Sequence, residues 1–191
     1  HHVLHDLDGK IAAVLDSGPA QVGLESTIVD LTAGSVPVIL RPGGISREAV
    51  EEVVGPVSVS KPDLQKSDIA KAPGMKYKHY APKGDLSVVK GNEKDVVAYI
   101  NTEIISKSAA GEIVGVIATD ETMQLYHGGV VRSIGTRTDE ESIARHLYSV
   151  LREFDEVGAT RIYSEEFNMP RIGQAIMNRL IKAAGHSIIQ T

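Results

Sequence analysis

The sequence contains no cysteine and few aromatic residues, and it has neither a long apolar run nor an excess of positive charge. Without cysteine there are no disulfides and no thiol chemistry, which fits a reducing compartment, so we expect a cytoplasmic protein. No apolar run approaches the roughly 18 residues of a membrane-spanning helix, and we expect no membrane association. The formal net charge of −5 argues against a general nucleic-acid-binding protein, which is usually basic.

The scarce aromatic residues, 4% of the chain, include two tyrosines that fall within one ten-residue segment, residues 73–82. Prolines bracket this segment, and it has neither a helical nor a strand period, so a regular element is not expected. Its centre, Lys76-Tyr77-Lys78-His79-Tyr80, combines cations that can offset phosphate charge with rings that can stack on a base. This composition predicts that the segment is an ordered peptide that reaches into an anionic site for a nucleotide-like ligand. The alternative is a solvated basic loop.

From residue 86 onward, strand-like and helix-like segments alternate. Residues 113–118 form an almost continuous apolar run, which is typical of a strand covered on both faces. The alternation predicts an α/β fold, with a Rossmann-like three-layer domain, a mainly parallel sheet and helices on both faces. We expect Asn92 to cap one helix and Asp120 to cap a short one, and Thr138 to form a capping box with Glu141.

The first sixty residues are rich in strand-like segments. We expect strands at residues 11–15, 26–31 and 36–40, followed by a helix that Ser46 caps and Gly55 ends. This part is too small to bury a comfortable core alone, so it is interpreted as the end of a larger domain. The predicted division is 1–60 for that part, 61–82 for an interdomain linker or lid, and 83–191 for the Rossmann-like domain.

Three segments, in this order and at this spacing, resemble one family, the two-domain L-threonylcarbamoyladenylate synthases, and the resemblance includes a fourth segment later in the chain. In that family a YrdC-like catalytic domain precedes a Rossmann-like C-terminal domain. The segments are Gly23-Leu24-Glu25-Ser26-Thr27-Ile28-Val29-Asp30, Leu40-Arg41-Pro42-Gly43, Pro73-Gly74-Met75-Lys76-Tyr77-Lys78-His79-Tyr80-Ala81-Pro82 and Ala175-Ile176-Met177-Asn178-Arg179-Leu180.

The resemblance implies a nucleotidyltransferase that condenses ATP, L-threonine and bicarbonate into threonylcarbamoyl-AMP and pyrophosphate. It also implies Mg²⁺ bound with the ATP, and downstream proteins that use the product to make threonylcarbamoyladenosine in tRNA. Direct binding of tRNA by this chain is not expected. The sequence lacks the Lys-x-Arg and Ser-x-Asn segments that line much of the site in the family. We therefore expect a C-terminal portion that is inactive alone.

The same resemblance implies roles for three residues: Ser26 at the threonine site, and Arg41 and Tyr80 at ATP. Each has an alternative. Thr27 could replace Ser26, because successive strand residues face opposite sides. Arg41 could be a surface residue paired with Glu25 or Asp30, and Glu25 itself could fix Arg41 or face water.

Supporting contacts to ATP are expected from Lys76, Lys78 and His79. Catalytic residues remain unknown, and no metal ligand is predicted in this chain. The second domain has no G-x-G-x-x-G motif after its first strand, so its shape alone does not indicate a dinucleotide cofactor. The alternative function is a non-catalytic nucleotide-binding or regulatory interaction module centred on residues 86–191.

Overall fold

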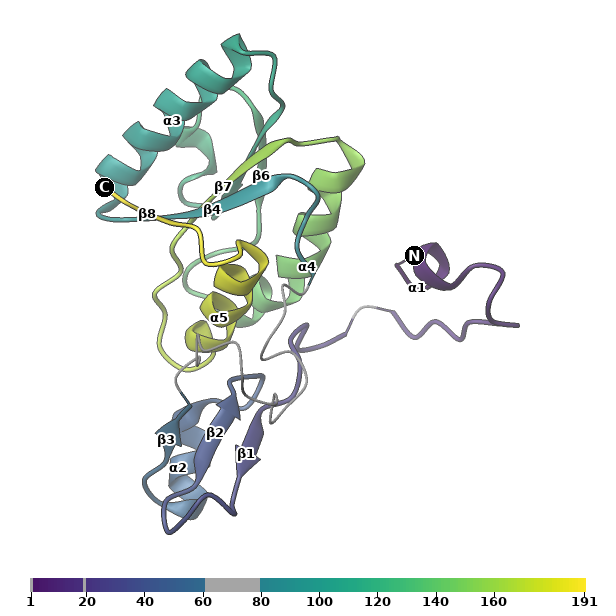
Figure 1. Ribbon diagram of the computed structural model, residues 1–191, viewed down its shortest axis with the longest axis vertical. Helices are drawn as coiled ribbons and strands as arrows, with labels where there is room; N and C mark the ends of the chain where they lie inside the picture. The colour runs from purple at the N-terminus through teal and green to yellow at the C-terminus, as the bar shows by residue number, and fades with distance from the viewer. Residues whose placement is uncertain (1, 19, 61–79) are drawn as a thin grey trace, which may run out of the picture.

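The computed structural model describes residues 2–18, 20–60 and 80–191 (Figure 1). In chain order the elements are α1 (His2–Leu7), β1 (Ile28–Asp30), β2 (Val38–Arg41), α2 (Arg47–Val54), β3 (Ser58–Val59), β4 (Asp85–Lys90), α3 (Glu93–Ala109), β5 (Val114–Ala118), the 3₁₀ helix η1 (Met123–Leu125), β6 (Val130–Ser133), α4 (Glu140–Glu156), β7 (Arg161–Glu165), α5 (Gly173–Ala183) and β8 (Ile188–Gln190).

The later strands form one parallel sheet in the order β6-β5-β7-β4-β8. Every residue of β5 is buried, as expected for an apolar strand with sheet neighbours on both sides and helices over both faces. The predicted α/β fold with a mainly parallel sheet is therefore confirmed. Parallel strands end at the same edge of the sheet, so the carboxyl ends of β4, β5, β6 and β7 lie near one another.

Helices cover both faces of this sheet, α3 on one face and α4 with α5 on the other (Figure 1). On α4 the expected apolar stripe is buried, and it packs with α5 in the larger hydrophobic cluster. The stripe consists of Ile143, Leu147, Val150, Leu151 and Phe154.

Helix capping follows the sequence at some positions and departs from it at others. Asn92 caps α3 by accepting from the Asp95 amide, as expected. The prediction that Thr138 and Glu141 form a capping box was wrong. Asp139 caps α4 instead, by accepting a hydrogen bond from the Ser142 amide. The Asp139 carboxylate, one residue after Thr138, accepts from a free amide of the first helical turn, so α4 begins after Asp139.

The expected cap at Asp120 was also wrong. η1 begins after Thr122, which makes no side-chain capping bond. Asp120 instead accepts a hydrogen bond of 2.5 Å from the Ser133 hydroxyl. The residue therefore ties the end of β5 to the end of β6.

A smaller sheet is formed by the first sixty residues, in the order β1-β2-β3. β1 pairs antiparallel with β2, and β2 pairs parallel with β3. Ser46 caps α2 by accepting from the Ala49 amide, and Gly55 ends it, both as expected. The boundaries 1–60, 61–82 and 83–191 stay a prediction, since residues 61–79 lie outside the described ranges.

The strand expected at residues 11–15 does not form. These residues are exposed, Leu15 to 99%, and they belong to no strand. Apolar composition alone is not sufficient for a strand, because the backbone also needs a neighbouring strand to satisfy its hydrogen bonds.

Candidate functional site

The structure brings Ser26 and Arg41 together. Arg41 is the last residue of β2 and stands opposite Ile28 of β1, so the pairing of these strands sets it beside the residues that precede β1. Its Nε and one terminal nitrogen donate to the Ser26 carbonyl oxygen at 3.2 and 3.0 Å, and the same terminal nitrogen lies 3.2 Å from Ser26 Oγ. Two of the three expected ligand-binding residues, Ser26 and Arg41, therefore lie together where the end of β2 meets the segment before β1, which we call the small-sheet corner.

The neighbouring hydroxyl, Thr27, has a structural use. Its Oγ1 donates to the Ile45 carbonyl oxygen at 2.6 Å and accepts from the Ile45 amide at 3.1 Å. Both bonds hold the loop after β2 against the start of β1. This arrangement favours Ser26 over Thr27 as the ligand-facing hydroxyl.

The segments that carry Ser26 and Arg41 cross in close contact at Gly43. A Cβ added at Gly43 would lie 2.3 Å from the Glu25 carbonyl oxygen and 2.5 Å from the Ser26 carbonyl carbon, which no side chain could tolerate. Next to it, the Gly44 amide donates to the same Glu25 oxygen at 3.0 Å. Glycine is required here by the close approach of the two backbones.

The Glu25 side chain has different partners from those expected. Arg179 of α5 donates from Nε to Glu25 Oε2 at 2.6 Å, and the Tyr148 hydroxyl of α4 donates to the same oxygen at 2.9 Å. Arg179 also donates to the Pro42 carbonyl oxygen at 3.0 Å. The expected contact with Arg41 and the alternative of open water were thus both wrong for Glu25, which joins the small sheet to the large one.

Positive charge dominates this corner. Burial opposes ionisation of Glu25, but the hydrogen bond and charge of Arg179 outweigh it and hold the pKa of Glu25 below its ordinary value. Burial, and then repulsion by Arg179, lower the pKa of the Lys182 ammonium, to which Arg41 also adds repulsion. Among the described residues, three cationic side chains (Arg41, Arg179 and Lys182) and the Glu25 carboxylate therefore interact at this corner, which suits an anionic ligand.

Tyr80 is linked to this corner through Tyr148. The two rings are in contact, with centroids 4.6 Å apart and planes tilted by 49°, and the Tyr148 hydroxyl donates to Glu25, the residue before Ser26. Tyr80 has a backbone φ of 56°, and the residue is 55% exposed. The other expected contacts, Lys76, Lys78 and His79, lie outside the described residues.

A cavity of about 360 Å³ adjoins Tyr80. Its lining combines the end of the 73–82 segment with the outer face of α4 and with α1, and includes Tyr80, Pro82, Tyr148, Arg152 and Asp6. Arg152 and Asp6 form an ion pair of 2.7 Å across it. Residues 80–82 therefore lie beside α4.

Sequence reasoning assigned no role to Arg179 or Tyr148. A signal for Arg179 was present, because it lies three residues after Ile176 and four after Ala175, on the apolar stripe of α5. A buried arginine on such a stripe needs a specific partner. No comparable signal marked Tyr148, whose partners come from segments distant in sequence.

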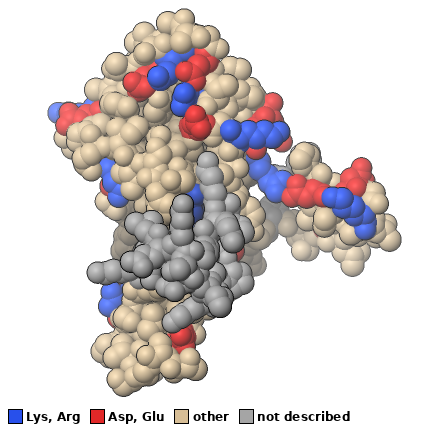
Figure 2. Space-filling model, in the orientation of Figure 1, with Lys and Arg blue, Asp and Glu red and all other residues tan. Residues whose placement is uncertain are grey.

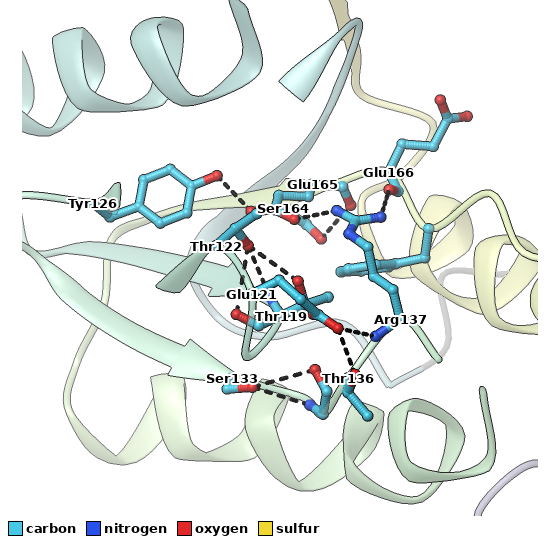
Figure 3. A network of polar contacts seen from close by, with 12 residues as sticks. Thr119, Glu121, Thr122, Tyr126, Ser133, Thr136, Arg137, Ser164, Glu165 and Glu166 are labelled. Carbon is cyan, nitrogen blue, oxygen red and sulfur yellow. Dashed lines mark hydrogen bonds and ion pairs between the residues drawn. The ribbon is translucent and has the colours of Figure 1, made fainter. Parts of the chain in front are cut away.

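A second polar region lies at the carboxyl edge of the large sheet (Figure 3). Glu165, at the end of β7 and only 2% exposed, accepts from the Tyr126 hydroxyl at 2.6 Å and pairs with Arg137. Arg137 also donates to the Glu166 carbonyl oxygen at 3.3 Å, and its amide donates to Glu121 at 2.9 Å. These contacts tie the loops after β5, β6 and β7 together.

A cavity of about 290 Å³ opens beside this network, between the end of β4 and the start of α3. Its charged lining consists of Glu93, Glu165, Glu166 and Arg137. Lys90 at its margin pairs with Glu166 at 2.5 Å. Carboxylates outnumber cations in this lining, so the small-sheet corner suits a phosphate better than this cavity does.

The described ranges contain no group of three or more His, Cys, Asp or Glu side chains that could hold a metal ion. None of the helices formed by the described residues has the length and apolarity that a bilayer crossing requires.

Comparisons with known proteins agree with the geometry. Residues 45–185 match the family model described as threonylcarbamoyl-AMP synthase, C-terminal domain. Over 99% of this chain and 53% of the relative, the sequence is 42% identical to a threonylcarbamoyl-AMP synthase of Bacillus subtilis. It is 41% identical to that of Pyrococcus abyssi over 100% of this chain and 54% of the relative.

The fold is also that of a solved structure. The crystal structure of P. abyssi Sua5 complexed with L-threonine superposes with a TM-score of 0.89 and 39% identity, covering 100% of this chain and 54% of that one. The chain spans about half the length of the curated relatives it matches. It belongs to the threonylcarbamoyl-AMP synthase family and contains that family's C-terminal domain.

Proposed function

We propose that the intact protein is an L-threonylcarbamoyladenylate synthase, which makes threonylcarbamoyl-AMP and pyrophosphate from ATP, L-threonine and bicarbonate. The observation that carries the proposal is the contact between Arg41 and Ser26 at a cationic corner of the small sheet. The P. abyssi relative crystallised with L-threonine supports threonine as the amino acid.

In the proposed reaction, threonine and bicarbonate first give a carbamate with loss of water. A carbamate oxygen then attacks the α-phosphorus of ATP, and the bond from that phosphorus to the pyrophosphate oxygen breaks. Negative charge develops on the phosphate oxygens and on the leaving pyrophosphate, which a guanidinium such as Arg41 stabilises through paired hydrogen bonds. No side-chain nucleophile is needed, because positioning and electrostatics are sufficient for such a transfer.

Ser26 and Tyr80 have distinct proposed roles. The Ser26 hydroxyl lies beside Arg41 and can bond the carboxylate or the nitrogen of a small amino acid. Tyr80, a half-exposed residue whose ring contacts that of Tyr148, is proposed as one wall of the ATP site. Closure of the segment that carries Tyr80 over the adenylate would exclude water from a product that hydrolyses readily.

Mg²⁺ is proposed only as a companion of ATP. Near Ser26 and Arg41 the described carboxylate is Glu25, and it is already bonded to Arg179 and Tyr148. These residues do not fit a protein-held Mg²⁺, which prefers free carboxylates together with substrate phosphates. No step is assigned to the ion.

The proposed product serves tRNA modification through downstream proteins in the cytoplasm. On the face shown in Figure 2, Lys and Arg are interspersed with Asp and Glu, rather than gathered into a basic stripe. A tRNA-binding surface usually has such a stripe. In line with the formal net charge of −5, we propose that the intermediate is handed on by other proteins.

The test is pyrophosphate release from ATP by the full-length protein. We expect release to require both L-threonine and bicarbonate. Ser26→Ala should raise the KM for threonine, and Arg41→Ala should lower kcat/KM for ATP by roughly 10² or more, the range seen when a transition-state donor is lost. Arg47→Ala is the control, because Arg47 pairs with Glu51 within the small-sheet unit. Release without threonine would refute the proposal.

The alternative, a non-catalytic nucleotide-binding module within residues 86–191, makes a different prediction. Calorimetric titration of ATP into residues 1–191 separates the two, because this part of the protein lacks the Lys-x-Arg and Ser-x-Asn segments. Binding that survives both Arg41→Ala and Tyr80→Ala would place the nucleotide in the second domain.

A further inference from the structure

Arg179 connects the two segments that carry the proposed ligand contacts. Its Nε bonds Glu25, the residue before Ser26, and one terminal nitrogen bonds the carbonyl oxygen of Pro42, the residue after Arg41. The other terminal nitrogen donates to Asn178 Oδ1 at 2.8 Å. All three nitrogens of the guanidinium therefore have a described acceptor.

The geometry of a guanidinium makes this contact directional. Its nitrogens lie in one plane at fixed angles, so bonding two acceptors at once restricts the separation between them. Here one acceptor belongs to Glu25, which precedes β1, and the other to Pro42, which directly follows β2, at the point where Ser26 meets Arg41. Arg179 therefore restricts the distance between Ser26 and Arg41.

Arg179 is itself held firmly. It is only 6% exposed, and α5 is anchored in the core by Ile176 and Leu180, both fully buried. The adjoining α4 adds the Tyr148 hydroxyl on the same Glu25 oxygen. The guanidinium is thus presented by a rigid element, which is the condition for holding another segment in place.

We infer that Arg179 is a positioning residue for the threonine and ATP site, through which the C-terminal domain sets the spacing of Ser26 and Arg41. The inference rests on the proposed function for its effect on catalysis. Its structural part, the restraint of residues 25–27 and 41–44, stands on the contacts alone.

The experiment uses the full-length protein with Arg179→Lys and Arg179→Gln. Lysine keeps the charge but offers a point donor that cannot hold both acceptors at a fixed separation. We expect kcat/KM for threonine to fall roughly 10- to 100-fold in Arg179→Lys, as for a small misplacement of reacting groups, with a melting temperature close to that of the wild type. Arg179→Gln should show a larger loss.

The matched control is Arg132→Gln, which removes another guanidinium–carboxylate pair, between β6 and Glu153 of α4. The described hydrogen bonds of Arg132 go to Glu153 and to the Val131 carbonyl oxygen, and not to residues 25–27, residues 41–44 or Tyr80. We expect wild-type kinetics from it. Wild-type kcat and KM in a folded Arg179→Lys protein would overturn the inference.

Hydrogen exchange provides a readout that does not depend on the proposed activity. The Gly44 amide donates to Glu25 and the Ile45 amide to Thr27, so both report the spacing of the segments. We expect their exchange to accelerate at least severalfold in Arg179→Lys but not in Arg132→Gln. Unchanged exchange would overturn the inference even if the wild-type protein proved to have a different activity.

Discussion

At the scale of single residues, Glu25 depends on neighbours more than 120 positions away in sequence. Its carboxylate accepts from Tyr148 and Arg179, and its backbone oxygen accepts from Gly44. Its side chain thus bonds α4 and α5 of the second domain, while its backbone bonds the loop after β2. The ionised form is the one that these donors favour.

A pH dependence follows from this preference. The folded-state pKa of Glu25 lies below its ordinary value of 4.5, so its contribution to stability is complete above that value and is lost as the pH falls through the folded pKa. We expect the free energy of unfolding of the wild type to exceed that of Glu25→Gln near pH 6, and the difference to shrink as the pH falls below 4.5.

Urea denaturation of both proteins across this range measures the difference. Glu48→Gln, at an exposed position in the first turn of α2, is the control for the loss of one carboxylate in the same unit. A gap between wild type and Glu25→Gln that stayed constant, or widened with acid, would contradict the assignment of Arg179 and Tyr148 as its partners.

At the scale of elements, α4 and α5 each have two tasks. One side of each packs on the large sheet, through residues such as Leu147 and Ile176. Their remaining surface meets the early part of the chain through Tyr148, Arg179 and the backbone near Arg145. In Figure 1, α5 accordingly lies between the two sheets.

Gly23 offers a direct test of this docking. It has a φ of +73°, and an added Cβ would lie 2.4 Å from the Arg145 Cα on α4. Gly9 has nearly the same φ, +71°, but open space around its Cβ position. We expect Gly23→Ala to cost about 1–3 kcal/mol more than Gly9→Ala, because both share the backbone strain and only Gly23 adds the clash.

Chemical denaturation of the two variants and the wild type gives the comparison. Since the φ values match, the difference reports on packing against α4. Equal destabilisation by the two substitutions would mean that the segment around Gly23 does not rest on α4.

At the scale of the whole molecule, the two sheets are unequal in what they bury. The members of both hydrophobic clusters with fully or nearly fully buried side chains all lie within residues 83–191. In the described part of residues 1–60, the buried apolar side chains are Ile39 and Val57. Leu24 is partly buried, and it packs against the larger cluster of the second domain. The smaller sheet thus relies on contacts beyond its own core.

This inequality predicts different behaviour on dissection. We expect residues 83–191 alone to unfold cooperatively, since the complete parallel sheet and both clusters lie within them. Residues 1–60 alone should show no cooperative transition, because so small a core does not offset the loss of chain entropy.

Thermal melts followed by circular dichroism, with dispersion of amide signals in NMR spectra, would decide both expectations. The same measurements test the predicted division at residues 61–82. A non-cooperative melt of 83–191 would show that the larger sheet needs the first part of the chain in order to fold.

The sequence by itself determined the larger sheet and its helices. Continuous apolar runs, such as Val114–Ala118, and helical stripes, such as that from Ile143 to Phe154, report burial directly, because each period matches one kind of element. Short motifs also indicated Ser26, Arg41 and the 73–82 segment as candidate ligand contacts. It failed at residues 11–15, where the apolar pattern was present but no neighbouring strand accompanied it.

Only the tertiary structure decided what surrounds Ser26 and Arg41. The bonds from Arg179 and Tyr148 to Glu25 join residues separated by 154 and 123 positions, and no local period or motif encodes such a distance. Choosing between Ser26 and Thr27 likewise depended on Ile45, which meets Thr27 only after the chain has folded. Hydrogen-bond partners are set by proximity in space, whereas a sequence pattern records only which side of an element is buried.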